Sequence, residues 1–87
     1  MTEETLLTFP CSFPLKIMGE NTDAFEQRAL AIVGAHVAKG DVNEVAVRLS
    51  ASAKYRALSV TVTARSREQL DALYRDLTSD PLVKVVL

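Results

Sequence analysis

The sequence has 87 residues, of which ten are basic and eleven acidic, so its formal charge is −1. This length allows one small domain with a modest core. The balanced charge disfavours a dedicated nucleic-acid binder, which usually carries a basic excess or stripe.

The first predicted elements are an N-terminal arm over residues 1–11 and a strand over residues 12–18. Apolar side chains occupy every second position of this strand, which is the period of a pleated strand. Gly19 is predicted to end the strand at a turn, because glycine permits backbone conformations that other residues resist. The alternating residues are Phe13, Leu15 and Ile17.

A helix is predicted over residues 23–38. Asn21, Thr22 and Asp23 are all suitable N-cap residues, and Gly40 is a stop signal just past the last turn. One face of this helix carries a single stripe at helical spacing. The stripe consists of Phe25, Ala29, Ile32, Val33 and His36.

Two strands follow, over residues 43–50 and 55–64, joined by a turn at 51–54. Each alternates apolar and polar positions, as expected of strands with two different faces. The apolar faces are predicted to hold Val45, Val47 and Leu49 in the first strand and Leu58, Val60, Val62 and Ala64 in the second.

The last two elements are a helix over residues 67–78 and a strand over residues 82–87. Ser66 and Gln69 have the spacing of a capping box at the start of the helix. The pair Asp80-Pro81 breaks the chain after it. In the final strand Val83, Val85 and Leu87 are predicted to share one face.

The order βαββαβ predicts an α+β domain of the ferredoxin-like kind over residues 12–87. Each βαβ half needs a crossover, which is normally right-handed. The expected result is a four-stranded antiparallel sheet with both helices on one face. The first and third strands are then central, and the other face of the sheet stays open.

Reactive side chains give no pattern of a catalytic or metal site. His36 is the one histidine and lies on the apolar stripe of its helix, without a second histidine as a metal partner. Cys11 is the one cysteine and has no base near it in sequence. We therefore expect no catalytic residue, no metal and no cofactor.

A single cysteine also excludes a disulfide within the chain and favours a reducing cytoplasm. The acidic start of the sequence is unlike a signal peptide. No apolar run approaches the roughly 20 residues of a membrane-spanning helix. The expected location is the cytoplasm, without contact with a membrane.

Nucleic-acid recognition by this fold uses aromatic residues on the open face of the central strands. Among the residues predicted there, Tyr55 is the single aromatic one, so we expect no nucleic-acid partner. The others are Lys16, Met18, Ala57, Ser59, Thr61 and Thr63.

One loop is a candidate ligand-binding site: Met18, Gly19, Glu20 and Asn21. It joins the first central strand to the first helix, beside the helix N-terminus, where backbone N–H groups point outward. A small polar ligand fits such a place. The simpler alternative is that Gly19 is a turn and Asn21 or Thr22 a helix cap.

An ordered set of residues over nearly the whole chain resembles the YbeD-like family of bacterial proteins. None of these residues forms a catalytic motif. The set consists of Leu6-Leu7, Phe9-Pro10, Phe13, Lys16-Ile17-Met18-Gly19, Ser50, Tyr55, Ser59-Val60, Gln69, Leu73-Tyr74, Leu77, Val83-Lys84 and Val86-Leu87.

The resemblance implies a fold similar to ACT domains, regulatory domains that bind amino acids or related small molecules. It carries over only Gly19 and its neighbours, because ACT domains often have a glycine between the first strand and the first helix. The family tends to have glycine where this chain has Ala53. Either the hairpin turn differs here, or that position never needed glycine.

Two hypotheses of function follow. The first is a non-catalytic regulatory or protein-interaction module of bacterial metabolism, whose partner is another protein or a second copy of the chain. The alternative is an ACT-like sensor that binds an amino acid or related metabolite near residues 18–21.

Overall fold

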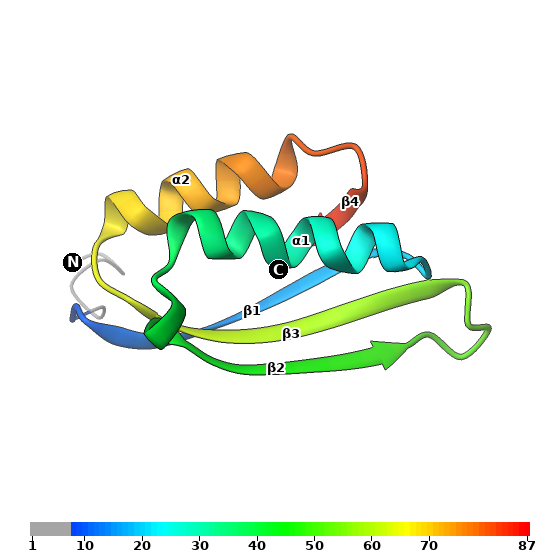
Figure 1. The fold of residues 1–87 in the computed structure, drawn as a ribbon, viewed down its shortest axis with the longest axis horizontal. Helices are drawn as coiled ribbons and strands as arrows, with labels where there is room; N and C mark the ends of the chain where they lie inside the picture. Colours follow the sequence, from blue (N-terminus) through cyan, green and yellow to red (C-terminus); the bar gives the residue numbers. More distant parts are fainter. Residues whose placement is uncertain (1–7) are drawn as a thin grey trace, which may run out of the picture.

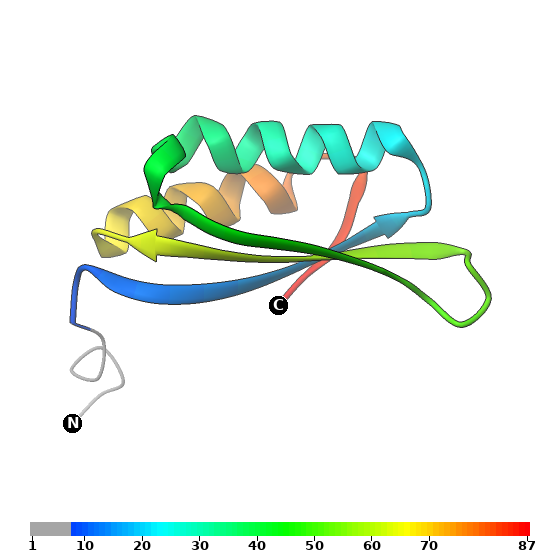
Figure 2. The same cartoon turned by 60° about the horizontal axis from the view of Figure 1, so that its bottom comes forward.

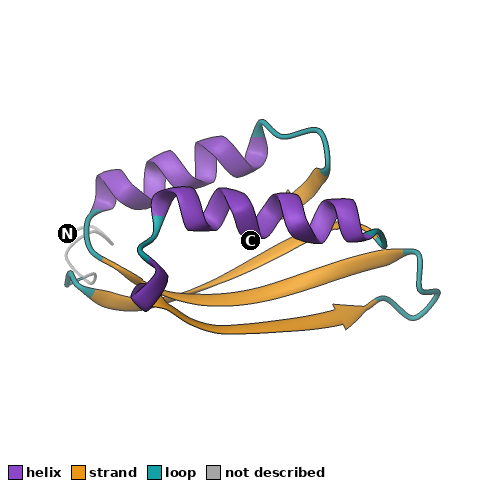
Figure 3. Ribbon diagram, in the orientation of Figure 1, coloured by secondary structure: helices purple, strands orange, loops and turns teal. Residues whose placement is uncertain are grey.

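The computed structural model describes residues 8–87. Its strands form one antiparallel sheet in the order β2-β3-β1-β4, and both helices cover the same face of it (Figures 1 and 3). The predicted ferredoxin-like fold is therefore confirmed, with β1 and β3 central. The elements are β1 (Cys11–Glu20), α1 (Asp23–His36), the 3-10 turn η2 (Lys39–Asp41), β2 (Val42–Leu49), β3 (Tyr55–Ala64), α2 (Arg67–Thr78) and β4 (Val83–Val86).

The predicted arm lies mostly outside the described residues, and Cys11 already belongs to β1. β1 also continues past Gly19 to Glu20, so the prediction that Gly19 ends the strand is wrong. Gly19 pairs with Arg56 of β3 and with Val83 of β4, and its φ is not positive.

The core lies between the helices and the inner face of the sheet. Alternate residues of β1 and β3 face inward, where they meet the apolar stripes of the two helices. The largest fully buried side chains are Phe25, Leu15, Ile17, Leu58, Leu73, Leu77, Val33, Val60 and Val62.

Side chains cap both helices at their N-termini, as predicted. Thr22 Oγ1 accepts a hydrogen bond from the Phe25 N–H at 3.1 Å, and Ser66 Oγ accepts one from the Gln69 N–H at 3.1 Å. α1 ends at His36, two residues earlier than predicted, because Val37 turns to an extended backbone with ψ of 130°. Val37 thereby becomes part of the core.

An ion pair ties α1 to the connection between α2 and β4. Arg28 Nε donates to Asp80 Oδ2 at 2.6 Å, and the Leu82 N–H donates to Asp80 Oδ1 at 2.9 Å. Asp80 is the one buried charged residue in the described part of the chain. The Arg28 guanidinium, followed by the Leu82 N–H, lowers the pKa of the Asp80 carboxyl from its ordinary value.

A bulge in β4 changes which of its side chains point toward the core. Val83 pairs with Gly19 whereas Val85 pairs with Met18, so Lys84 is an extra residue on the β4 side. The prediction that Val83, Val85 and Leu87 share a face is therefore wrong. Val83 is buried under the helices, while Val85 and Leu87 are exposed.

The β2–β3 hairpin turns through Ala53, whose φ is 58°. The Ala53 N–H donates to the Ser50 carbonyl at 2.8 Å, and Ser50 Oγ accepts from the N–H groups of Lys54 and Tyr55. This settles the question that the sequence left open. The turn does require the left-handed conformation, and alanine adopts it at some cost in conformational energy.

We predict that stability falls at acidic pH partly through Asp80. Its pKa is lower in the folded than in the unfolded chain. Its carboxylate therefore stabilises the fold above about pH 4, and this contribution is lost as pH falls through the folded-state pKa. In urea titrations between about pH 5 and about pH 2, Asp80→Asn should flatten the decline in unfolding free energy.

Asp71→Asn is the matched control, because Asp71 is exposed on α2 and has no partner among residues 8–87. Its pH dependence should match that of the unmodified chain. An identical slope for Asp80→Asn would show that the Arg28–Asp80 pair contributes nothing to acid sensitivity.

Candidate functional site

Among residues 8–87, no helix or strand covers the sheet face opposite the helices (Figure 2). The β1–β3 register places on it the residues predicted to be there, since residues directly opposite each other share a face. The register also adds Glu20 opposite Tyr55 and, through the neighbouring strand, Ala46 opposite Ser59.

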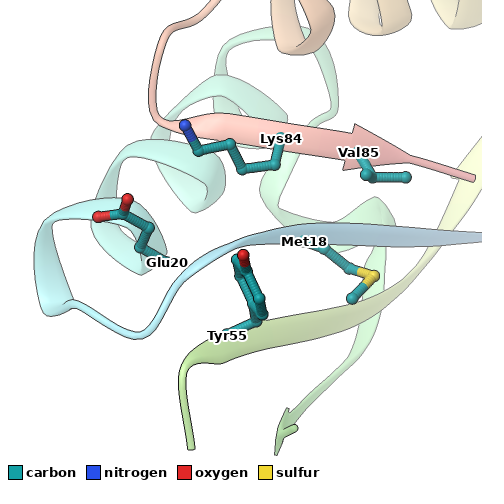
Figure 4. Close-up of a pocket in the computed structure, with 5 residues that line it drawn as sticks. All are labelled: Met18, Glu20, Tyr55, Lys84 and Val85. Carbon is teal, nitrogen blue, oxygen red and sulfur yellow. The ribbon is translucent and has the colours of Figure 1, made fainter.

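This open face is hollowed near the end of β1, where it forms a depression of about 480 Å³. Its volume is in the range of sites that hold small ligands. We call it the open-face depression, and it is lined by Met18, Glu20, Tyr55, Lys84 and Val85 (Figure 4).

The open-face depression combines an apolar surface with two opposite charges. Figure 4 shows Glu20 and Lys84 toward one end, Met18 and Val85 toward the other, and the Tyr55 ring between strands β1 and β3. Within residues 8–87 neither Glu20 nor Lys84 forms an ion pair or a side-chain hydrogen bond. Both charges are therefore free to meet a ligand or a partner.

The bulge in β4 places two of the residues that line this depression. Because Lys84 is the extra residue opposite the step from Met18 to Gly19, it joins Val85 on the open face. The sequence pattern gave no sign of the bulge, so Lys84 and Val85 were not among the predicted site residues. Tyr55 was predicted to lie on the open face. It was considered there only as a stacking residue for nucleic acid, for which a single aromatic side chain is too little.

Gly19 is not part of the open-face depression. It is buried on the opposite face, where a Cβ atom would overlap the Phe25 ring and lie 2.6 Å from the Leu82 carbonyl oxygen. Glycine is required here for close packing between β1, α1 and the chain before β4, rather than for a turn.

Asn21 binds the protein itself. Its amide donates to the Ala53 carbonyl at 2.9 Å, and its Oδ1 accepts from Arg56 Nε at 2.9 Å. Arg56 Nη1 continues the network to Asp23 and Glu26 of α1. Asn21 and Glu20 also border a second hollow of about 270 Å³ beside the hairpin, which Tyr55 lines as well. Of the four predicted site residues, the structure brings together Met18 and Glu20 in the open-face depression.

His36 and Cys11 lie apart from this site. His36 Nε2 is 2.9 Å from Asp76 Oδ2, and its carbonyl accepts from Gln69 Nε2, so His36 links α1 to α2. Cys11 begins β1, and Glu20 ends it roughly 30 Å away at 3.3 Å per residue. Over residues 8–87 no three His, Cys, Asp or Glu side chains gather as metal ligands would.

Neither helix of the described chain has the length and apolar character needed to cross a membrane.

Residues 4–87 match the family described as "Protein of unknown function (DUF493)". A UPF0250 protein from Paraburkholderia phytofirmans is 46% identical over 84 residues, which covers 97% of this chain and 94% of the relative. A UPF0250 protein from Nitrosomonas europaea is 42% identical over the full length of both chains. The chain belongs to the DUF493 family, which is the YbeD-like family that the sequence resembles.

Solved structures share the fold at low sequence identity. The ACT domain of a GTP pyrophosphokinase from Chlorobium tepidum matches with a TM-score of 0.69 and 10% identity, over 87% of this chain and 94% of that one. An uncharacterized protein from Thermotoga maritima matches with a TM-score of 0.67 and 10% identity, over 87% and 92%. The ACT-like fold predicted from the resemblance is confirmed.

We predict that Gly19→Ala destabilises the protein by about 1–3 kcal/mol, because the added methyl group overpacks the space beside Phe25. Gly34→Ala is the matched control. Apart from its chain neighbours and the nearby backbone of α1 itself, its methyl group would meet nothing within 4 Å, and it should stabilise α1 by up to about 1 kcal/mol. Urea unfolding measures both. Equal effects at the two positions would contradict the packing role of Gly19.

Proposed function

We propose that this DUF493 protein is a non-catalytic regulatory module of the bacterial cytoplasm that binds a partner protein through the open face of its sheet. The proposal rests on one observation: the open-face depression, in which Tyr55 and Val85 are 40% and 43% exposed on a face that neither helix of residues 8–87 covers.

The composition of the open-face depression favours a protein partner. Binding energy at protein interfaces concentrates in a few central residues, and tyrosine is one of the types enriched among them. Tyr55 lies opposite Glu20 and lines the depression together with apolar Met18 and Val85, with Glu20 and Lys84 toward one end. An apolar centre with a polar rim is the usual anatomy of such interfaces.

The fold supports a regulatory role by analogy. ACT domains are regulatory, and one of them, in a GTP pyrophosphokinase, has this fold. Since a fold hosts many functions, the analogy adds to the site and does not replace it.

The first test starts from tagged full-length protein expressed in a bacterium that encodes a DUF493 protein. Cross-linking followed by mass spectrometry should identify a partner, and the purified pair then gives a dissociation constant. Tyr55→Ala should raise that constant at least about tenfold, because it removes the aromatic anchor.

Thr61→Ala is the matched control, since Thr61 lies on the same strand and face but outside the open-face depression. It should bind like the unmodified chain. The proposal fails if Tyr55→Ala binds the partner as tightly as Thr61→Ala does. It also fails if the protein turns over a substrate and one polar substitution abolishes the activity.

A second candidate function is an ACT-like sensor of an apolar amino acid. The unpaired charges of Glu20 and Lys84 favour it, because a free amino acid carries one ammonium and one carboxylate. Lys84 would bind the carboxylate and Glu20 the ammonium. An aliphatic side chain would then lie against Met18 and Val85.

Titration of the labelled protein with L-leucine, L-methionine and N-acetyl-L-leucine, read by NMR chemical shifts, tests the sensor. Leucine should shift the signals of Met18 and Val85. Glu20→Gln should weaken leucine binding about tenfold, the effect of one charged hydrogen bond. N-acetyl-leucine, which lacks the ammonium, should bind both forms equally weakly.

The sensor hypothesis fails if millimolar leucine and methionine leave the signals of the open-face depression unchanged. It fails equally if Glu20→Gln and the unmodified protein bind leucine with the same affinity.

A further inference from the structure

The outer edge of β2 offers free backbone groups. β2 is an edge strand, and its only neighbour in the described sheet is β3. The Ser50 N–H donates to the Tyr55 carbonyl, and these two residues continue the β2–β3 register. Since hydrogen-bonded pairs alternate along antiparallel strands, Glu44, Ala46 and Arg48 bond to β3. The N–H and C=O groups of residues 45, 47 and 49 point away from the sheet.

The same three residues carry apolar side chains that remain exposed. Val45 and Val47 lie opposite the buried Val60 and Leu58, so they are on the helix side of the sheet. Val45, Val47 and Leu49 are nevertheless 42%, 48% and 48% exposed, because the helices leave this edge uncovered.

Proteins usually protect such an edge with proline, lysine, a bulge or an inward-pointing charge. The β2 bulge lies between Val42 and Glu44, at the start of the strand. From Val45 to Leu49 there is no proline, no lysine and no charge on the helix side. This stretch is therefore open to pairing with another strand.

The charged side chains of β2 on the open face indicate which strand would pair with this edge. Glu44 and Arg48 lie two residues before and two after Ala46, on the open face. In the described part of the chain neither has an ion-pair or hydrogen-bond partner for its side chain. An antiparallel strand with the same sequence, centred on Ala46, places an opposite charge across from each of them.

Only this register brings the free backbone groups of the two copies together and also places Glu44 opposite an arginine. About a two-fold axis through Ala46, Glu44 lies opposite Arg48 of the partner subunit, and Val45 lies opposite Val47 of the partner subunit. A two-fold axis through Val45 instead would place Glu44 opposite Ala46 of the partner subunit, which is uncharged. A centre on Val47 places it opposite Ser50 of the partner subunit. A two-fold axis that passes between two residues would place each residue with free N–H and C=O groups opposite a residue whose groups already bond to β3.

We propose that two copies of this chain pair through β2, antiparallel and centred on Ala46, so that their sheets join into one continuous sheet with all helices on the same face. Two symmetric Glu44–Arg48 pairs fix the register on the open face. Val45, Val47 and Leu49 of the two copies form one apolar strip on the helix side. This interface is separate from the open-face depression and does not depend on the proposed function.

Charge reversal tests the register. Glu44→Arg alone sets arginine against arginine, and Arg48→Glu alone sets glutamate against glutamate, so each should raise the dimer dissociation constant at least about tenfold. An equimolar mixture of the two variants pairs opposite charges at both positions. The mixture should form a heterodimer as stable as the unmodified dimer. The doubly reversed chain should dimerise alone.

Sedimentation equilibrium of the full chain from about 10 µM to about 1 mM reads these states. Glu68→Arg is the control, because Glu68 is exposed on α2 and is not part of the β2 edge, and it should dimerise normally. Val47→Lys should give a monomer whose circular dichroism shows the native fold. An unmodified chain that stays monomeric throughout overturns the proposal. So do single reversals that dimerise normally, or a mixture that fails to restore the dimer.

Discussion

One constraint governs this molecule: two helices cover one face of a four-stranded sheet. Burial of the inner face supplies the core, because alternate residues of β1 and β3 meet Phe25, Val33, Leu73 and Leu77 there. The hydrophobic effect acts mainly on this interface. The opposite face and residues 45–49 of β2 lie outside the core cluster. Their exposed apolar residues are therefore free to serve binding rather than stability.

Most of the fold could be predicted, because periodicity and capping reflect local physics. The helix at Arg67–Thr78 and the strand at Tyr55–Ala64 have the predicted bounds, and Ser66 caps as expected. Gly19 was misinterpreted, since a single sequence does not separate a glycine at a turn from one under an aromatic ring. The bulge at Lys84 was missed because it is a property of two paired strands, whose register no local pattern encodes.

The residues that line the open-face depression could be predicted only in part. Met18 and Glu20 were predicted as parts of one loop, and they share the open face because β1 continues past Gly19 to Glu20. Tyr55, Lys84 and Val85 come from strands that are distant in sequence, and only the register brings them together. The exposure of Val45 and Val47 likewise depends on where the helices end across the sheet. The alternation along β2 predicts that they share a face but does not say whether that face is covered.

The idea that surfaces left outside the core serve recognition is tested most directly by amide hydrogen exchange along β2, measured by NMR at low and high protein concentration. In the monomer, the amides of Ala46 and Arg48 are bonded to β3 and should exchange slowly, whereas those of Val45, Val47 and Leu49 should exchange fast. At high concentration these three outward amides should become protected as well. Fast exchange of Val45, Val47 and Leu49 at every concentration would contradict the idea that this edge binds a second copy.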